Sequence, residues 1–182
     1  MSRVDNFIIR EGGGTRFANT LVLGQGLEIV DTAGGIPELA GSAFTGAKVW
    51  LAGNVNAPSH TETPIPFTEE ALDTDGFWTA AQPARFTVPA GRAGVYMVVA
   101  RGVFGAGPSA VRISGFRKNG AVGGLTRVEG AGSSLAATAT EIVRLEENDY
   151  VEMRVYQESG ATLPVIGGTP YETSFMITRL GI

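Results

Sequence analysis

The chain has 182 residues, of which 26 are glycine and 18% are charged; its formal net charge is −4, and it has no cysteine. The lysines and arginines are scattered, which argues against nucleic acid as a partner. The lack of cysteine excludes a disulfide framework, a thiolate zinc site and a thiol nucleophile. The length favours one good-sized domain with an appendage, and no apolar run suits a membrane span or a signal peptide, so we expect synthesis in the cytoplasm.

The first 14 residues predict a short arm followed by a flexible break. Three large apolar side chains, Phe7, Ile8 and Ile9, are flanked by charged residues, and glycines occupy positions 12–14. Leaving such side chains in water forgoes about 1.5–3 kcal/mol of burial for each of them. We therefore expect residues 1–14 to be an anchoring arm with a glycine linker, the alternative being a frayed terminus.

Residues 15–45 alternate short apolar stretches with glycines, a pattern typical of short strands joined by tight turns. About thirty residues bury too little surface to enclose a core alone. We expect a small β neck that packs with copies of itself about a three-fold axis. In style the segment resembles the neck segments of trimeric viral fibres.

From residue 46 onward, apolar and polar residues alternate with a period of two, and no helical stretch intervenes. Val151, Met153 and Val155, for example, fall on one face of an expected strand and polar residues on the other. This pattern predicts an all-β antiparallel sandwich in which each strand turns one face to the core. The expected strands span residues 48–52, 63–67, 84–88, 94–104, 110–118, 122–128, 135–145, 149–157 and 173–180.

Several motifs in this region carry a family resemblance. They are Gly94-Val95-Tyr96 in a long strand, Arg117-Lys118-Asn119-Gly120 at a hairpin, residues 145–151 before the penultimate strand, and Thr173-Ser174-Phe175 in the last strand. In this order they resemble the jelly-roll heads of the complement and tumour necrosis factor superfamily over about residues 47–182. Residues 69–78, followed by 86–89, look like the phage and bacterial version of that head. The resemblance implies a jelly-roll head over residues 46–182 and a homotrimer, because such heads usually associate about a three-fold axis.

The longest expected strand is apolar on both faces. If only one face is buried against a second sheet, Tyr96, Val98 and Phe104 stay exposed, and an exposed patch of that size usually marks an interface. We hypothesise that these residues, together with Tyr156 and Phe175, lie at or near the subunit contact. The alternative is that they fill the core of the sandwich.

Residues with catalytic or ligand-binding chemistry are few. The single histidine, His60, lies in a polar loop without a recognisable partner acid and nucleophile, and no cofactor or phosphate motif occurs. Asp73 and Asp75 lie in a sequence like the first half of a calcium loop, but the second half is absent, so turn capping is favoured over a metal site. Trp78 is a candidate ligand contact at a loop tip, although closing the end of the sandwich is the favoured role.

Together these features favour a non-enzymatic structural protein of a bacteriophage particle. We expect a trimeric head decoration, spike or short fibre at the virion surface, which docks on the capsid or another virion protein by its arm and projects its head. No nucleic acid, membrane insertion or cofactor is expected. The alternative is a tail-fibre tip or receptor-binding protein that recognises a host surface glycan. An enzyme acting on polysaccharide is less favoured, because no set of acid, base and nucleophile is recognisable.

Overall fold

The structure is a computed structural model that describes residues 27–30, 38–41, 44–132, 135–169 and 172–181. Contacts between residues divide the chain into two compact units, Met1–Gly41 and Ser42–Ile182. No helix long and apolar enough to cross a membrane occurs among the described residues.

In the first unit, two short strands pair antiparallel: β1 (Leu27–Val30) and β2 (Glu38–Gly41). Short strands of this kind are what the glycine-punctuated sequence predicted for residues 15–45. A two-stranded hairpin is at best marginally stable alone in water. The expected anchor residues Phe7, Ile8 and Ile9 lie outside the described residues, so the anchoring arm stays a prediction.

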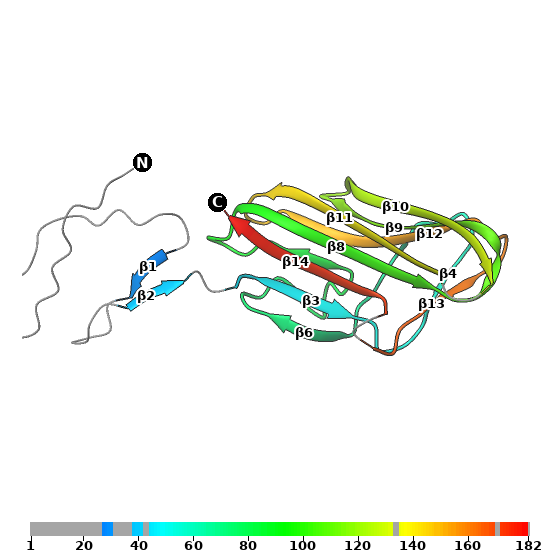
Figure 1. The fold of residues 1–182 in the computed structure, drawn as a ribbon, viewed down its shortest axis with the longest axis horizontal. Coiled ribbons are helices and arrows are strands. Elements are labelled where there is room, and N and C mark those ends of the chain that lie inside the picture. The colour runs from blue at the N-terminus through cyan, green and yellow to red at the C-terminus, as the bar shows by residue number, and fades with distance from the viewer. Residues whose placement is uncertain (1–26, 31–37, 42–43, 133–134, 170–171, 182) are drawn as a thin grey trace, which may run out of the picture. The chain divides into compact units, whose positions relative to one another are not determined.

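The second unit is a sandwich of two sheets in which every strand pairing is antiparallel (Figure 1). The seven-stranded sheet has the order β4 (Val55–Ala57), β13 (Leu163–Val165), β8 (Gly94–Phe104), β14 (Ser174–Gly181), β3 (Gly46–Trp50) and β6 (Glu69–Asp73), and β11 (Leu135–Leu145) also pairs with β8. The five-stranded sheet has the order β10 (Ala121–Gly132), β9 (Gly107–Lys118), β12 (Tyr150–Gln157) and β5 (Thr63–Pro64), and β7 (Arg85–Thr87) also pairs with β12.

The core lies between the two sheets. In β12 buried and half-buried residues alternate, as the period of two predicts, and Val151, Met153 and Val155 are buried. At the centre of the core the Phe175 ring stacks on the Phe86 ring, with ring centroids 4.7 Å apart and an angle of 15° between their planes. The antiparallel sandwich expected from the sequence is therefore confirmed.

The tight turn between β9 and β10 follows from two residues that tolerate positive φ. Asn119 has φ 48° and Gly120 has φ 86°, the signs that a type I′ hairpin turn requires at both central positions. The sequence therefore predicted this hairpin correctly.

Three strands were not expected from the sequence: β4, β6 and β13. The first and the third are only three residues long, too short for a period of two to be recognised. Strand β6 has the sequence EEALD and lies at the edge of its sheet. Carboxylates on an edge strand hinder pairing with further strands, so the acidic segment is a protected edge rather than the loop that the sequence suggested.

Candidate functional site

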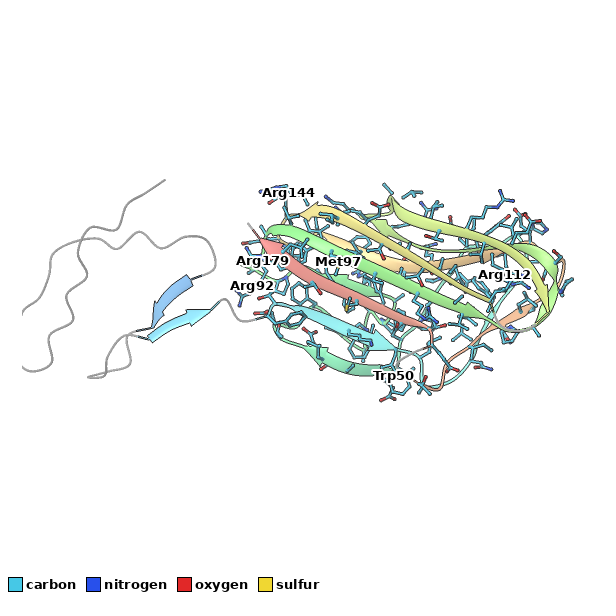
Figure 2. The ribbon with its side chains drawn as sticks, in the orientation of Figure 1. Trp50, Arg92, Met97, Arg112, Arg144 and Arg179 are labelled. Atoms are coloured by element: carbon cyan, nitrogen blue, oxygen red, sulfur yellow. The ribbon has the colours of Figure 1, made fainter. Side chains whose placement is uncertain are left out.

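The seven-stranded sheet presents an apolar surface on the side that faces away from the core. In β8 the buried residues alternate with half-buried ones, and the half-buried ones include Val95, Met97 and Val99. We define the outer face as the outward side chains at the centre of this sheet, which are Val95, Met97, Val99, Ile142, Met176 and Thr178. Figure 2 shows Met97 within this surface and Trp50 near its border with β6.

Strand register brings these side chains together. Val99 lies directly opposite Met176 of β14, and Met97 lies directly opposite both Thr178 of β14 and Ile142 of β11. Side chains at directly opposite positions of neighbouring strands share a face and contact each other. The outer face is thus a continuous apolar surface across three strands, and Ile142 at its β11 margin is 65% exposed.

The structure places four of the five predicted interface residues elsewhere. Tyr96, Val98, Phe104 and Phe175 are fully buried inside a single chain, so the alternative in which they fill the core holds for them. The expectation that burying one face of β8 leaves Tyr96, Val98 and Phe104 exposed is wrong, because their face is the one that packs against the second sheet. The outward face of the same strand is the one with Val95, Met97 and Val99.

Tyr156, the fifth residue, lies on the five-stranded sheet and is half-buried. Its hydroxyl donates to Glu158 Oε1 over 3.1 Å and lies 3.4 Å from His60 Nδ1. Burial and the hydrogen bond to the Glu158 carboxylate raise the pKa of Tyr156 above its ordinary value. His60 thus lies beside a phenol whose raised pKa keeps it protonated. The group of His60, Tyr156 and Glu158 includes neither a nucleophile with a lowered pKa nor a buried acid that would orient the histidine.

A shallow cleft on the five-stranded sheet lies next to this group and is bordered by an ion-pair network. The Glu62 carboxylate accepts a hydrogen bond of 2.9 Å from Arg117 Nε, and Arg154 NH1 lies 3.7 Å from it. The hydrogen bond from Arg117 keeps the pKa of Glu62 below its ordinary value, against the opposing effect of burial. The network ties the loop that contains Glu62 to β9 and β12, a positioning role that needs no ligand.

Asp73, at the end of β6, is a turn-capping residue. Its Oδ1 accepts hydrogen bonds from the backbone amides of Asp75, Gly76 and Phe77 over 2.9–3.2 Å, and its Oδ2 accepts one from Trp78 N over 2.8 Å. Four amides therefore occupy the oxygens that a calcium ion would need. Among the described residues, no group of three or more acidic, histidine or cysteine side chains is suited to hold a metal ion.

The neighbouring carboxylate, Asp75, is occupied as well. It accepts a hydrogen bond from Arg92 Nε over 2.8 Å and one from the Thr74 hydroxyl over 2.7 Å. Burial raises the pKa of the Asp75 carboxyl, but these two hydrogen bonds and the positive charges of Arg92 and Arg179 together outweigh it, so its pKa lies below the ordinary value. Hydrogen bonds within the chain thus occupy the carboxylate oxygens of both Asp73 and Asp75, the two residues nearest to the candidate calcium loop.

We predict that Asp73→Ala lowers the free energy of unfolding by about 1–3 kcal/mol, because buried or half-buried amides lose a charged acceptor. Thermal unfolding with and without calcium measures this effect, and calcium is expected to leave the parent protein unchanged. Glu70→Ala is the matched control, since it removes an exposed carboxylate from the same strand. A melting temperature of the parent protein that rises with calcium contradicts the capping interpretation.

Trp78 is half-buried and packs against the core. Its indole Nε1 donates to the carbonyl oxygen of Pro83 over 3.1 Å. This placement matches the alternative in which the ring closes the end of the sandwich. A contact of Trp78 with a ligand stays a prediction.

Neither a protein-family model nor a curated protein matches the chain. In fold, it is similar to murine APRIL at pH 5.0, with a TM-score of 0.57 and 10% identity over 76% of this chain and 100% of that chain. It is also similar to Eiger TNF from S. frugiperda, with a TM-score of 0.51 and 14% identity over 75% of this chain and 92% of that chain. The globular domain of zebrafish complement 1qA matches 74% of this chain and 93% of its own with 16% identity and a TM-score of 0.49.

The similarity to the first two structures shows the fold. The second unit is an all-β jelly-roll sandwich of the tumour-necrosis-factor-like kind, as the sequence motifs predicted. At identities of this size the likeness is one of architecture, and it carries no residue-level function to this chain.

Proposed function

We propose that the chain forms a homotrimer in which copies contact one another through the outer face. The observation that carries this proposal is the continuous apolar surface around Met97, Val99 and Met176, which no described element covers. A contiguous exposed apolar surface on a folded domain marks an interaction site. Met97 and Met176 suit such a contact, because the flexible thioether side chain adapts to an irregular partner surface.

A second copy of the chain is the partner that the surface fits best. At the centre of the outer face, Met97, Val99 and Met176 carry no charge, and the charged side chains of Lys48 on β3 and Arg101 on β8 lie at its border, as is typical of the buried centre of a homo-oligomeric contact. In a closed ring of three copies every contact is head-to-tail, so the β11 margin of one copy, with Ile142, contacts the β6 margin of the next. A ring of three follows from the resemblance of the sequence to heads that associate about a three-fold axis.

We further propose that the trimer is a non-enzymatic structural part of a bacteriophage particle, a head decoration, spike or short fibre displayed on the virion surface. The support lies in the phage-like motifs over residues 69–78 and 86–89 and in the arm with Phe7, Ile8 and Ile9. An apolar arm followed by glycines suits docking on a capsid or another virion protein. The carboxylates of the described turns cap backbone amides or pair with arginines, which favours a structural role over an acid–base role.

Native mass measurement of the full chain tests the trimer, with an expected mass three times the 19.0 kDa of one chain. Deletion of residues 1–11 tests the docking: the shortened chain is expected to stay trimeric and to lose binding to purified phage particles. Replacing Phe7, Ile8 and Ile9 by serine is the matched variant that keeps the length of the arm. Undiminished particle binding by both variants contradicts docking through the arm, and binding of the full chain to a host glycan instead favours the receptor-binding alternative.

A further inference from the structure

The two flanks of the outer face carry outward groups of opposite charge. On the β11 side, Arg101 points outward from β8, and its NH1 lies 3.5 Å from the hydroxyl of Thr138, so the guanidinium extends toward the β11 edge. On the β6 side, the exposed Glu69 lies directly opposite Trp50 of β3. Among the described residues, no arginine or lysine forms an ion pair with the Glu69 carboxylate.

Both charged residues belong to one row across the sheet. Arg101 lies opposite Ser174 of β14, Ser174 lies opposite Trp50, and Trp50 lies opposite Glu69. Arg101 and Glu69 are thus three strand spacings apart, about 14 Å at about 4.8 Å for each spacing. Because Trp50 stands between them, the two side chains of one chain do not reach each other.

A ring of identical copies brings these flanks together between chains. In a head-to-tail ring, the β11 flank of each copy contacts the β6 flank of the next. Rotation about an axis that runs along the strands keeps every residue at its own height, and residues of one row share a height. Arg101 and Thr138 lie at the β11 end of this row, and Glu69 lies at its β6 end. The Arg101 end of the row in one copy therefore meets the Glu69 end of the row in the next copy.

We propose that Arg101 of each copy pairs with Glu69 of the neighbouring copy, and that this ion pair sets the register of the ring. The inference rests on the proposed trimer and adds the groups that determine its specificity. The apolar outer face supplies affinity but tolerates sliding of one sheet along another, whereas oppositely charged groups fix register and disfavour mismatched contacts. The guanidinium matches a carboxylate with two parallel N–H donors, which makes the pair directional.

Charge reversal tests the pair in the full chain. Arg101→Glu and Glu69→Arg each place like charges at every contact, and each is expected to raise the concentration at which the trimer half-dissociates by at least about tenfold. The double variant Arg101→Glu/Glu69→Arg restores opposite charges and is expected to regain most of the parental association. Native mass spectrometry or sedimentation over a dilution series measures the three variants.

The matched controls are Arg127→Glu and Glu129→Arg, which reverse the same charges in an exposed ion pair of 3.6 Å on β10 of the other sheet. Both controls are expected to associate as the parent does. If a reversed variant fails to fold, a double-mutant cycle with Arg101→Gln and Glu69→Gln replaces it, and non-additive losses support the pair.

The outcomes separate the pair from the trimer. Restored association in the double variant supports the pair. A parental trimer whose double variant associates no better than the two single variants, or whose single variants match the controls, overturns the pair and leaves the trimer standing. A parent chain that stays monomeric overturns both.

Discussion

A Met97→Glu variant is expected to remain folded and to lose the trimer. Met97 points away from the core in the middle of the outer face, opposite Thr178 and Ile142 of the neighbouring strands. In a single chain the new carboxylate faces water, so the change costs little stability at an outward strand position. In the trimer it is buried without a partner charge, a situation that costs about 3–5 kcal/mol for each contact.

A loss of that size weakens each contact by about 100- to 1,000-fold or more, since every 1.4 kcal/mol is about a factor of ten in affinity. Native mass spectrometry and sedimentation are expected to show one chain, 19.0 kDa, at concentrations where the parent is trimeric. Circular dichroism and thermal unfolding check that the sandwich is intact.

Leu125→Glu is the matched control for this variant. Leu125 is 54% exposed and lies on β10 of the other sheet, so the same carboxylate is added to an exposed apolar position that is not part of the outer face. The control is expected to stay trimeric. A Met97→Glu protein that associates as tightly as the parent contradicts the outer face as the contact surface.

The sequence predicted the strands well where the period of two is long. The bounds of β8 and β11 agree with those expected, and β12 shows the predicted alternation of buried and half-buried residues. The hairpin at Asn119 and Gly120 was recognisable because its backbone conformation depends on those two residues alone. Local patterns of this kind need no knowledge of the partner strands.

The assignment of the two faces of β8 failed because, apart from Arg101, both faces are apolar, and the period of two does not say which one packs on a second sheet. The signal that distinguishes them is residue size. Ala100 and Gly102 lie on the face of Tyr96, and a Cβ on Gly102 would lie 3.1 Å from Ser114 Oγ and 3.2 Å from Val155. Small residues thus mark the face that the other sheet approaches closely.

The buried Arg112 was beyond the reach of sequence reasoning. It lies at the end of the sandwich opposite to Arg92, Arg144 and Arg179 (Figure 2), and only 1% of it is exposed. Its guanidinium donates to the carbonyl oxygens of Ala110, Gly130 and Pro108 over 2.7–3.2 Å. These acceptors are backbone carbonyl groups from two strands, and no pattern of residue types predicts where such groups lie. The burial of Arg112 therefore follows only from the three-dimensional fold.

Phe175→Ala is expected to lower the free energy of unfolding by about 3–5 kcal/mol, the cost of removing a fully buried aromatic ring and leaving a cavity. The Phe175 ring is stacked between Phe86, with centroids 4.7 Å apart, and Phe67, with centroids 6.0 Å apart. The Phe175 ring on β14 therefore packs against β7 of the other sheet and against the segment between β5 and β6 that contains Phe67. A loss of this size lowers the melting temperature by about 10 °C or more in a domain of this length.

The same variant separates a core role from an interface role when it is made together with Met97→Glu. In that monomeric background an interface residue has no contact left to lose, whereas a core residue still destabilises the chain by the same amount. Ile142→Ala is the control, because Ile142 is 65% exposed in a single chain and its loss is expected to cost less than about 0.5 kcal/mol there. If the double variant Met97→Glu/Phe175→Ala has the same free energy of unfolding as Met97→Glu alone, the burial of Phe175 contributes nothing to the stability of the single chain. The division between core face and outer face, on which the proposed trimer depends, is then wrong.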